Sequence, residues 1–399
     1  MTAFRFAHFA GATALALTIL FAAPQPAAAQ ANKKIRIGFV TTLSGPNAAY
    51  GQDMKNSVEL ALDHLGRKMG GIPVEVIYED DEQKPEVGKQ KTEKLLQRDK
   101  VDFVTGYIWS NVLLASYKPV VDANTFLISA NAGPSQLAGA QCNPYFFAAS
   151  YQNDQLPNAM GELLNQKGVK TLYIVAPGYA AGNDQANGVK ATFKGKVIGQ
   201  DMTKWPDQLD FSAEISKIRA ARPDAVYIFY PSRWGVQFLT QYSQAGLKKD
   251  VPLYSAFTVD AVSLTLQKDL ALDTYFGAFW GSDLPYAINQ KMVADFRKTH
   301  GRAPTFYGAQ SYDAINLIAS AVTATKGDLK NKPAVRKALE AAKFDSVRGA
   351  FKFGPNHFPI HNVYQQEAYK SADGGYDTRT VSTILTAYQD SHAAQCKMQ

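Results

Sequence analysis

The chain has 399 residues, which is more than one ordinary hydrophobic core accommodates and enough for two lobes. Hydrophobic residues make up 46% and aromatic residues 12%, so both lobes can bury a core and still place rings in a pocket. The formal net charge is +7, but the lysines are scattered along the expected helices. A nucleic-acid-binding surface would gather them with aromatic residues on one face, so no nucleic-acid partner is expected.

The first thirty residues have the pattern of an export signal. Arg5 supplies a positive start, residues 9–23 an apolar segment, and residues 27–29 the small side chains typical of a cleavage site. The apolar segment is too short for a membrane anchor, and no later run approaches about twenty apolar residues. The sequence therefore predicts a signal peptide over residues 1–29 and a soluble, exported mature protein.

The next part of the chain alternates between strands and helices in two series. The first series has expected strands at 35–40, 72–78, 101–106, 125–129 and 145–148, with helices at 52–68, from Pro85 onward and at 111–122. The second has expected strands at 172–175, 225–229 and 251–254, with helices at 154–167, 210–220 and 234–245. Such alternation indicates parallel sheets with helices on both faces. The predicted fold is α/β, with two similar doubly wound lobes facing each other.

The last third of the chain is expected to pass between the two lobes. A strand at 275–280 is expected to return to the first lobe, followed by helices at 287–299, 308–323 and near 333–343. Short strands at 348–353 and 362–365 are expected to cross back. The predicted lobes are residues 34–150 plus 277–354 and residues 151–276 plus 355–395. Several crossings would form a multi-strand hinge suited to closure around a ligand.

Two cysteines, Cys142 and Cys396, remain in the mature chain. In an oxidising compartment they are expected to form one disulfide that closes a long loop and holds the C-terminus. The alternative is two independent thiols.

Catalytic and metal-binding signatures are not found in the sequence. It has no phosphate-binding glycine–lysine loop, no G-x-S-x-G and no H-E-x-x-H, and two cysteines cannot form a thiolate metal cluster. The acidic run from Glu79 to Glu82 is more typical of a solvated loop before a helix than of a metal site. We therefore expect no catalytic residue, no metal and no cofactor.

The informative residues lie just after strand ends, where ligands bind in open α/β sheets. Ser110 opens an expected helix, so its hydroxyl and the nearby N–H groups can hold an anionic group. The turn from Asn131 to Ser135 offers further backbone donors. Rings fall at or near such turns at Tyr50, Trp109, Tyr179, Tyr230, Trp234 and Trp280. Together they predict a cleft lined for an aromatic or apolar ligand.

Three motifs carry a resemblance to a known family: Leu43 to Gly51, the turn from Ser129 to Pro134, and Tyr312 to Ala314. The chain resembles, over essentially its whole mature length, the leucine/isoleucine/valine-type periplasmic binding proteins of ATP-driven uptake systems. The resemblance implies a hinged, two-lobed (type I) binding protein of the periplasm, monomeric, that delivers its ligand to the membrane permease subunits of an ABC importer.

The resemblance also implies roles for particular residues. The serine and turn that hold the ligand carboxylate in that family correspond to Ser110 and to Asn131, Ala132 and Gly133. The ring after the first strand corresponds to Tyr50, and the second-lobe contacts correspond to Tyr179 and Tyr230.

Three features bear on the ligand. Amino-acid-binding members carry an acidic residue in the second lobe, for which Asp260 is the candidate. Trp109 stands where smaller residues are usual, and the pattern that includes Gln141 to Phe147 is closer to the branch that takes aromatic acids.

We therefore expect a carrier of a small aromatic carboxylate, similar to benzoate or a hydroxycinnamate. The alternatives are a branched-chain or other amino-acid carrier, with Asp260 binding the ammonium group, and an exported enzyme or sensory module.

Overall fold

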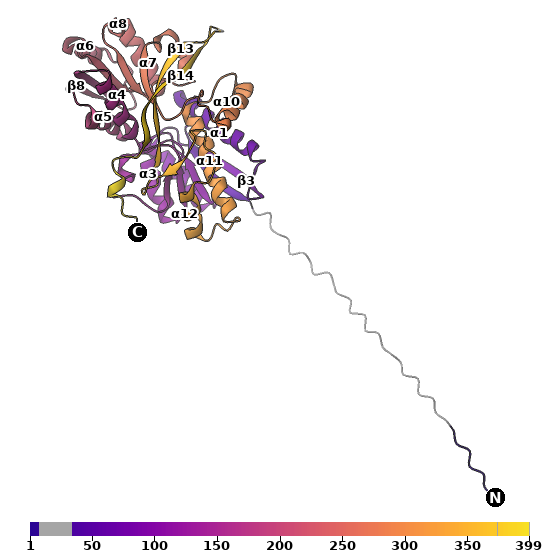
Figure 1. Cartoon of the computed structure of the whole chain (residues 1–399). Coiled ribbons are helices and arrows are strands. Elements are labelled where there is room, and N and C mark those ends of the chain that lie inside the picture. Colours follow the sequence, from indigo (N-terminus) through magenta and orange to yellow (C-terminus); the bar gives the residue numbers. More distant parts are fainter. Residues whose placement is uncertain (8–33, 373, 399) are drawn as a thin grey trace. The chain divides into compact units, whose positions relative to one another are not determined.

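The computed structural model describes residues 1–7, 34–372 and 374–398 (Figure 1). Most of the signal peptide expected over residues 1–29 lies outside the described residues. From Lys34 onward the described residues form one compact unit. Within the described part of the chain, we find no helix with the length and apolar character needed to cross a membrane.

The first lobe is built on a six-stranded sheet with the order β2-β3-β1-β4-β5-β6. Its strands are β1 (Ile35–Thr41), β2 (Lys68–Met69), β3 (Ile72–Asp80), β4 (Phe103–Gly106), β5 (Phe126–Ser129) and β6 (Phe146–Ala148). All pairings are parallel except that of the short edge strand β2 with β3. The strands β4, β5 and β6 are buried along their whole length, as expected for a sheet covered by helices on both faces.

Helices from two parts of the chain cover this first sheet. They are α1 (Ala48–His64), α2 (Pro85–Gln97) and α3 (Ser110–Asp122) from the N-terminal part, and α10 (Ala287–His300), α11 (Phe306–Ala324) and α12 (Lys332–Ala341) from the C-terminal part. Helix α11 packs against both α1 and α12, and α2 packs against α3.

The second lobe has an eight-stranded sheet with the order β12-β13-β11-β10-β9-β7-β8, and β14 pairs with β13. Its strands are β7 (Thr171–Pro177), β8 (Lys196–Thr203), β9 (Ala225–Phe229), β10 (Leu253–Ala256), β11 (Thr274–Ala278), β12 (Lys352–Phe353), β13 (Pro359–Lys370) and β14 (Tyr376–Tyr388). Its helices are α4 (Gln155–Gln166), α5 (Ala180–Thr192), α6 (Ser212–Ala221), α7 (Ser232–Gln244) and the single turns α8 (Leu247–Asp250) and α9 (Leu264–Gln267). The α/β fold with two doubly wound lobes is thus confirmed.

One strand was expected in the wrong lobe. We expected residues 275–280 to return to the first lobe, but β11 pairs in parallel with β10 and antiparallel with β13 inside the second sheet. A buried strand needs hydrogen-bond partners on both sides, and the second sheet supplies both. The chain leaves for the first lobe only after β11.

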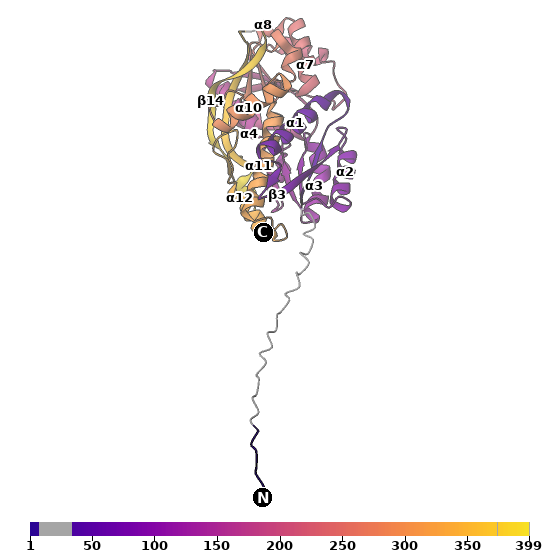
Figure 2. The ribbon, with the colours of Figure 1, turned by 90° about the vertical axis from the view of Figure 1, so that its right-hand side faces the viewer.

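The C-terminal hairpin is longer than expected. The strands β13 and β14 form a long antiparallel pair, drawn in yellow in Figure 2. Of the two short strands anticipated at 348–353 and 362–365, the first is present at 352–353 as β12, which pairs with β13, and the second is part of β13. Strand β14 is exposed or half-buried at every position but one and is rich in threonine and serine, so it lacks the apolar alternation that predicts a strand. Strand β8 was not anticipated either.

The chain passes between the lobes after β6, after β11 and before β12. These passages make the multi-strand hinge of the predicted fold.

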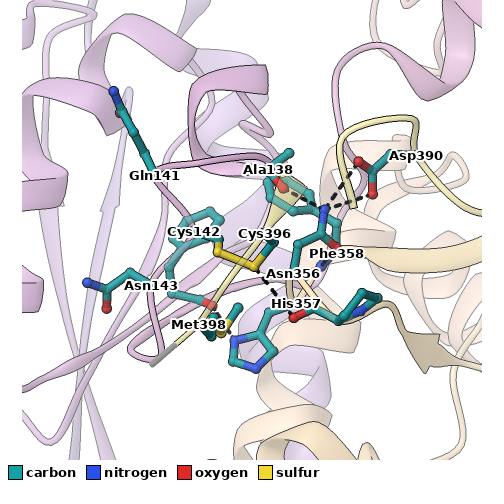
Figure 3. Close-up of a disulfide and its surroundings, with 12 residues drawn as sticks. Ala138, Gln141, Cys142, Asn143, Asn356, His357, Phe358, Asp390, Cys396 and Met398 are labelled. Atoms are coloured by element: carbon teal, nitrogen blue, oxygen red, sulfur yellow. Dashed lines mark hydrogen bonds between the residues drawn. A yellow bond between two sulfur atoms is a disulfide. The ribbon is translucent and has the colours of Figure 1, made fainter. Parts of the chain in front are cut away.

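The expected disulfide is confirmed. Cys142, in the loop before β6, is bonded to Cys396 near the C-terminus, with their Cα atoms 5.6 Å apart (Figure 3). Beside it, Asn356 Nδ2 donates to the carbonyl oxygen of Ala138 at 2.9 Å and to both carboxylate oxygens of Asp390. The bridge therefore attaches the C-terminal segment to the first lobe.

We expect a Cys142→Ser/Cys396→Ser double variant to be less stable but unchanged in ligand affinity. The bridge spans 254 residues, and closing a loop of that length removes unfolded-state entropy equivalent to about 5 kcal/mol in the chain-entropy account, or about 5 °C in Tm. Scanning calorimetry of the variant beside wild-type protein with and without reductant measures this. An unchanged Tm in both comparisons would contradict the prediction.

Candidate ligand-binding site

A cavity lies where the carboxyl ends of both sheets meet, with a space of about 330 Å³ that includes its solvent-open part. Its walls come from the segments that follow β4, β5, β6, β7, β9 and β10 and from the start of α11. They consist of Ile108, Trp109, Ser110, Asn131, Ala132, Tyr151, Asn153, Tyr179, Ala181, Gln185, Phe229, Pro231, Phe257 and Tyr307. This is the position that doubly wound sheets use for ligands.

Ser110 is the first residue of α3 and is buried at the cavity wall. Its Oγ accepts a hydrogen bond from Asn153 Nδ2 at 3.2 Å, so the hydroxyl proton remains available to donate. The N–H groups of the first turn of a helix have no partner within the helix and carry partial positive charge. This corner of the cavity therefore suits a carboxylate.

The turn after β5 offers fewer free donors than expected. The N–H of Ala132 donates to the Tyr107 carbonyl at 3.0 Å, and the N–H of Gly133 donates to Asn153 Oδ1 at 3.2 Å. Gly133 packs so closely that an added Cβ would lie 1.9 Å from the Tyr151 carbonyl oxygen. This glycine shapes the turn and does not itself line the cavity.

A continuous row of rings crosses from one lobe to the other. The Trp109 indole of the first lobe donates its N–H to Thr42 Oγ1 at 2.8 Å, and its ring centroid lies 5.5 Å from that of Trp205 in the second lobe. Trp205 in turn stacks on Tyr179 at 4.3 Å with the planes 9° apart. Trp234 packs on both tryptophans. The lobes are in contact across the cleft through these rings.

Of the residues expected to contact a ligand, the structure brings together five at this cavity: Trp109, Ser110, Asn131, Ala132 and Tyr179. It does not bring Tyr50, Gly133, Tyr230, Asp260 and Trp280 to it. Side chains alternate along a strand, so Phe229, the last residue of β9, lines the cavity while Tyr230 does not. The Tyr230 ring packs on Phe211 at 4.8 Å instead.

Tyr50, Trp280 and Asp260 lie outside the ligand cavity and make other contacts. Tyr50 packs edge-on against Tyr307 at 5.5 Å, one layer behind the cavity wall. Trp280 donates its indole N–H to Asn289 Oδ1 at 2.6 Å. Trp280 and Asp260 line a second cavity, described below.

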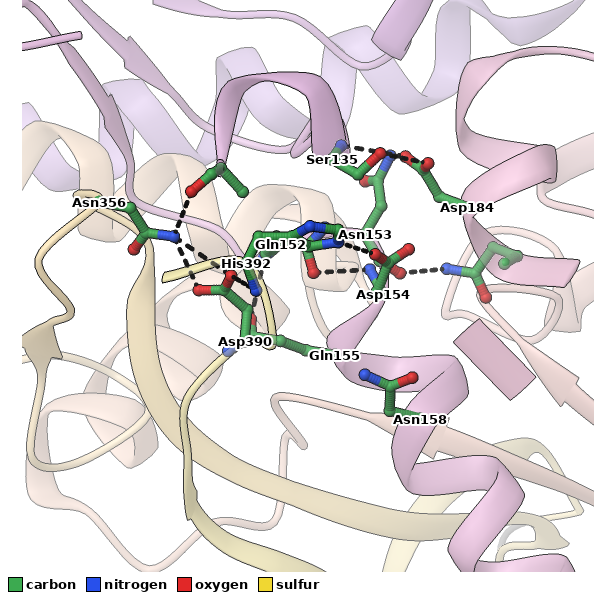
Figure 4. Close-up of polar contacts among 12 residues, drawn as sticks. Ser135, Gln152, Asn153, Asp154, Gln155, Asn158, Asp184, Asn356, Asp390 and His392 are labelled. Carbon is green, nitrogen blue, oxygen red and sulfur yellow. Dashed lines mark hydrogen bonds and ion pairs between the residues drawn. The ribbon is translucent and has the colours of Figure 1, made fainter. Parts of the chain in front are cut away.

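Among the described residues that line the ligand cavity, none carries a formal charge. One buried carboxylate lies behind the wall: Asp184 accepts from Asn153 Nδ2 at 2.8 Å and from Ser135 N and Oγ at 3.1 and 2.6 Å (Figure 4). Because Ser135 belongs to the first lobe and Asp184 to α5, these bonds join the lobes. Burial raises the pKa of Asp184 to about 6, although its hydrogen bonds act in the opposite direction.

Several wall residues were missed from the sequence. Phe229, Tyr151 and Phe257 stand at or just after expected strands, so the strand-end rule applied to every strand would have included them. Tyr307 lies at the start of a helix, and no strand-end signal points to it.

The sequence model of the periplasmic binding protein family matches residues 34–374. The chain belongs to the periplasmic binding protein family. This binding protein is 27% identical over 391 residues to "Leu/Ile/Val-binding protein homolog 6" of Brucella suis, covering 93% of this chain and 96% of the relative.

Two solved structures are similar to this binding protein along most of its length. An ABC transporter solute-binding protein from R. palustris in complex with benzoate is 29% identical, with a TM-score of 0.85, and the match covers 92% of this chain and 100% of that one. One from Rhodopseudomonas palustris BisB5 in complex with 3,4-dihydroxybenzoic acid is 26% identical, with a TM-score of 0.81, covering 90% and 99%. This chain is an ABC-type solute-binding protein, and its family and fold are those of substrate-binding transport proteins.

Proposed function

We propose that this protein captures a small aromatic carboxylate, similar to benzoate or a hydroxycinnamate, in the cavity between its lobes. The observation that carries the proposal is a cavity walled by rings, without a formal charge on its described lining, and with a helix start and a free hydroxyl at one end. The rings can stack on a flat ligand, and Ser110 with the first turn of α3 can donate to its carboxylate.

The same wall is poorly suited to an amino acid. A buried ammonium group needs acceptors, best a carboxylate, and none of the described residues on this wall carries one. Two of its amide oxygens already accept hydrogen bonds, Asn131 Oδ1 from Tyr151 and Gln185 Oε1 from Tyr227. Phe257 occupies the wall in the stretch where Asp260 was the candidate for the ammonium. The name of the Brucella relative favours the alternative of branched-chain amino acids, and the experiment below separates the two.

The wider role follows from the family. The proposal includes an exported, periplasmic, monomeric carrier that performs no catalysis, closes its hinge on the ligand and presents it to the permease subunits of an ABC importer. The contacts of Trp109 with Trp205 and of Ser135 with Asp184 are those that such a closure would form.

Calorimetric titration of ligand-free protein tests the ligand class. We expect benzoate, 4-hydroxybenzoate or 4-hydroxycinnamate to bind with micromolar or lower Kd and leucine and isoleucine to give no heat of binding. Binding of the aliphatic amino acids without binding of any aromatic acid would overturn the proposal.

The carboxylate clamp is tested by Ser110→Ala. Losing one hydrogen bond to a charged group is expected to weaken aromatic-acid binding by about 10- to 100-fold. The matched control is Ser116→Ala, a buried serine on the same helix that does not line the cavity and should leave Kd within about twofold. Equal effects of both substitutions would remove Ser110 from the proposed contacts.

A further inference from the structure

A second cavity, which no part of the proposed function uses, lies beside the hinge. Its walls leave a space of about 540 Å³, part of which is open to solvent. Its walls are the segment after β10, the end of β11 with the passage that follows it, the residues before α11 and the first turns of α11, and parts of β13 and β14. Phe257 is the wall that it shares with the ligand cavity.

Two buried polar side chains on this second cavity have unused hydrogen-bonding atoms. Gln310 of α11 is 1% exposed, and neither its Oε1 nor its Nε2 has a hydrogen-bond partner among the described residues. Asp260 is 4% exposed; its Oδ1 accepts from the N–H groups of Val262 and Ser263, at 2.7 and 3.0 Å, and its Oδ2 has no partner in the described part of the chain. Unsatisfied buried polar atoms are costly, so these oxygens point to an additional molecule.

The charges around the cavity favour a cation. The other carboxylate on its wall, Asp377, is paired with Arg297 at 2.5 Å. Behind the wall, Asp53 is paired with Arg302 at 2.6 Å. Asp260 has no cationic side chain within ion-pair distance among the described residues, so the cavity carries an uncompensated negative charge when Asp260 is ionised.

The remaining walls are aromatic. Phe257, Phe276, Phe279, Trp280 and Phe306 surround the same space. A carboxylate combined with aromatic faces is the arrangement that recognises organic ammonium groups. Bare Ca²⁺ or Mg²⁺ needs about six oxygen ligands, which Asp260 Oδ2 and Gln310 Oε1 do not supply.

We propose that this hinge cavity is a second ligand site that binds a compact organic cation, an alkylammonium group. Asp260 Oδ2 and Gln310 Oε1 accept hydrogen bonds from its N–H groups, and the rings cover its alkyl part. The site is independent of the ligand cavity except at Phe257.

Titration of the full chain with n-butylammonium chloride tests the site, with n-butanol and sodium chloride at matched ionic strength as reference titrants. We expect n-butylammonium to bind with a Kd in the millimolar range or below and the reference titrants to give no saturable signal. Gln310→Leu, which removes both unpaired atoms at similar volume, should weaken this binding by about tenfold or more. Asp260→Asn, which keeps the Oδ1 acceptor, should abolish it.

Two controls make the result specific. Gln290→Leu, on the exposed face of α10, should leave n-butylammonium binding unchanged. Gln310→Leu should bind benzoate as the wild type does, so failure of benzoate to bind at all would concern the proposed function and not this site. Absence of n-butylammonium binding to wild-type protein, binding that survives both substitutions, or full displacement by benzoate would each overturn the inference.

Discussion

Trp109→Ala should weaken aromatic-acid binding by about 30- to 1000-fold, the range for truncation of a central buried aromatic anchor. Trp109 lines the ligand cavity and is the first-lobe member of the row of rings that includes Trp205. Its removal takes away both a ligand contact and a contact across the cleft. Under the proposed function these contacts form only when the lobes close, so Tm of the ligand-free protein should fall by only a few degrees.

The matched control is Trp280→Ala, which truncates a buried tryptophan that does not line the ligand cavity. Its indole N–H donates to Asn289 of α10, a contact that does not cross the ligand cavity, so we expect a larger loss of Tm than for Trp109→Ala and a smaller loss of affinity. Kd from calorimetric titration and Tm from scanning calorimetry give both quantities. The reverse order of effects would make Trp109 a core residue.

Arg348→Met should cost about 3–5 kcal/mol in the free energy of unfolding, the usual penalty for removing one partner of a buried ion pair. Arg348 Nε donates to Asp313 Oδ2 at 3.1 Å. Its other nitrogens donate to the carbonyls of Ala149 and Ser150, where the chain first leaves the first lobe. The substitution leaves one carboxylate and two carbonyl oxygens buried without this partner.

The pH dependence of this loss in free energy of unfolding provides a second readout. Burial raises the pKa of Asp313 above its ordinary value even with Arg348 present. A carboxyl group with a raised folded-state pKa favours folding at low pH and loses that contribution as the pH rises through its folded pKa. Without Arg348 the pKa of Asp313 rises further. The loss in free energy of unfolding caused by Arg348→Met should therefore become smaller as the pH falls from neutrality.

Urea unfolding of wild type and variants at several pH values measures these effects. Arg336→Met, which breaks the exposed pair with Glu340, is the matched control and should cost less than about 1 kcal/mol. Equal losses for the two arginines, or a deficit that grows as the pH falls, would contradict the role given to the buried pair.

Most of the fold could be predicted from local patterns. Apolar runs such as Ile35–Thr41 mark strands because a strand covered on both faces is apolar throughout. Strand β14 was not predicted because one of its faces meets solvent and its sequence is polar. Strand β11 was assigned to the wrong lobe because the strands with which it pairs are distant in the sequence, and its own residues do not indicate which strands these are.

The residues of the candidate site could be predicted from the sequence where they directly follow the end of a strand. Trp109, Ser110 and Tyr179 follow strand ends, and all three line the cavity. Tyr230 follows one too but lies in the second-lobe core, because one residue along a strand reverses the direction of the side chain. Their contact with a ligand remains a prediction.

The amino-acid sequence by itself determined that this chain forms two α/β lobes, because these depend on local periodicity and on residue type. It favoured a Cys142–Cys396 disulfide over two independent thiols, and the structure decided for the bond. Only the tertiary structure decided which side chains come together. Phe257 lines the ligand cavity, Asp260 lines the second cavity beside the hinge, and the Trp205 ring contacts the Trp109 ring. The physical reason is that a cavity is lined by side chains at the ends of several strands that are distant in the sequence. No single segment of the sequence determines how those side chains are arranged relative to one another.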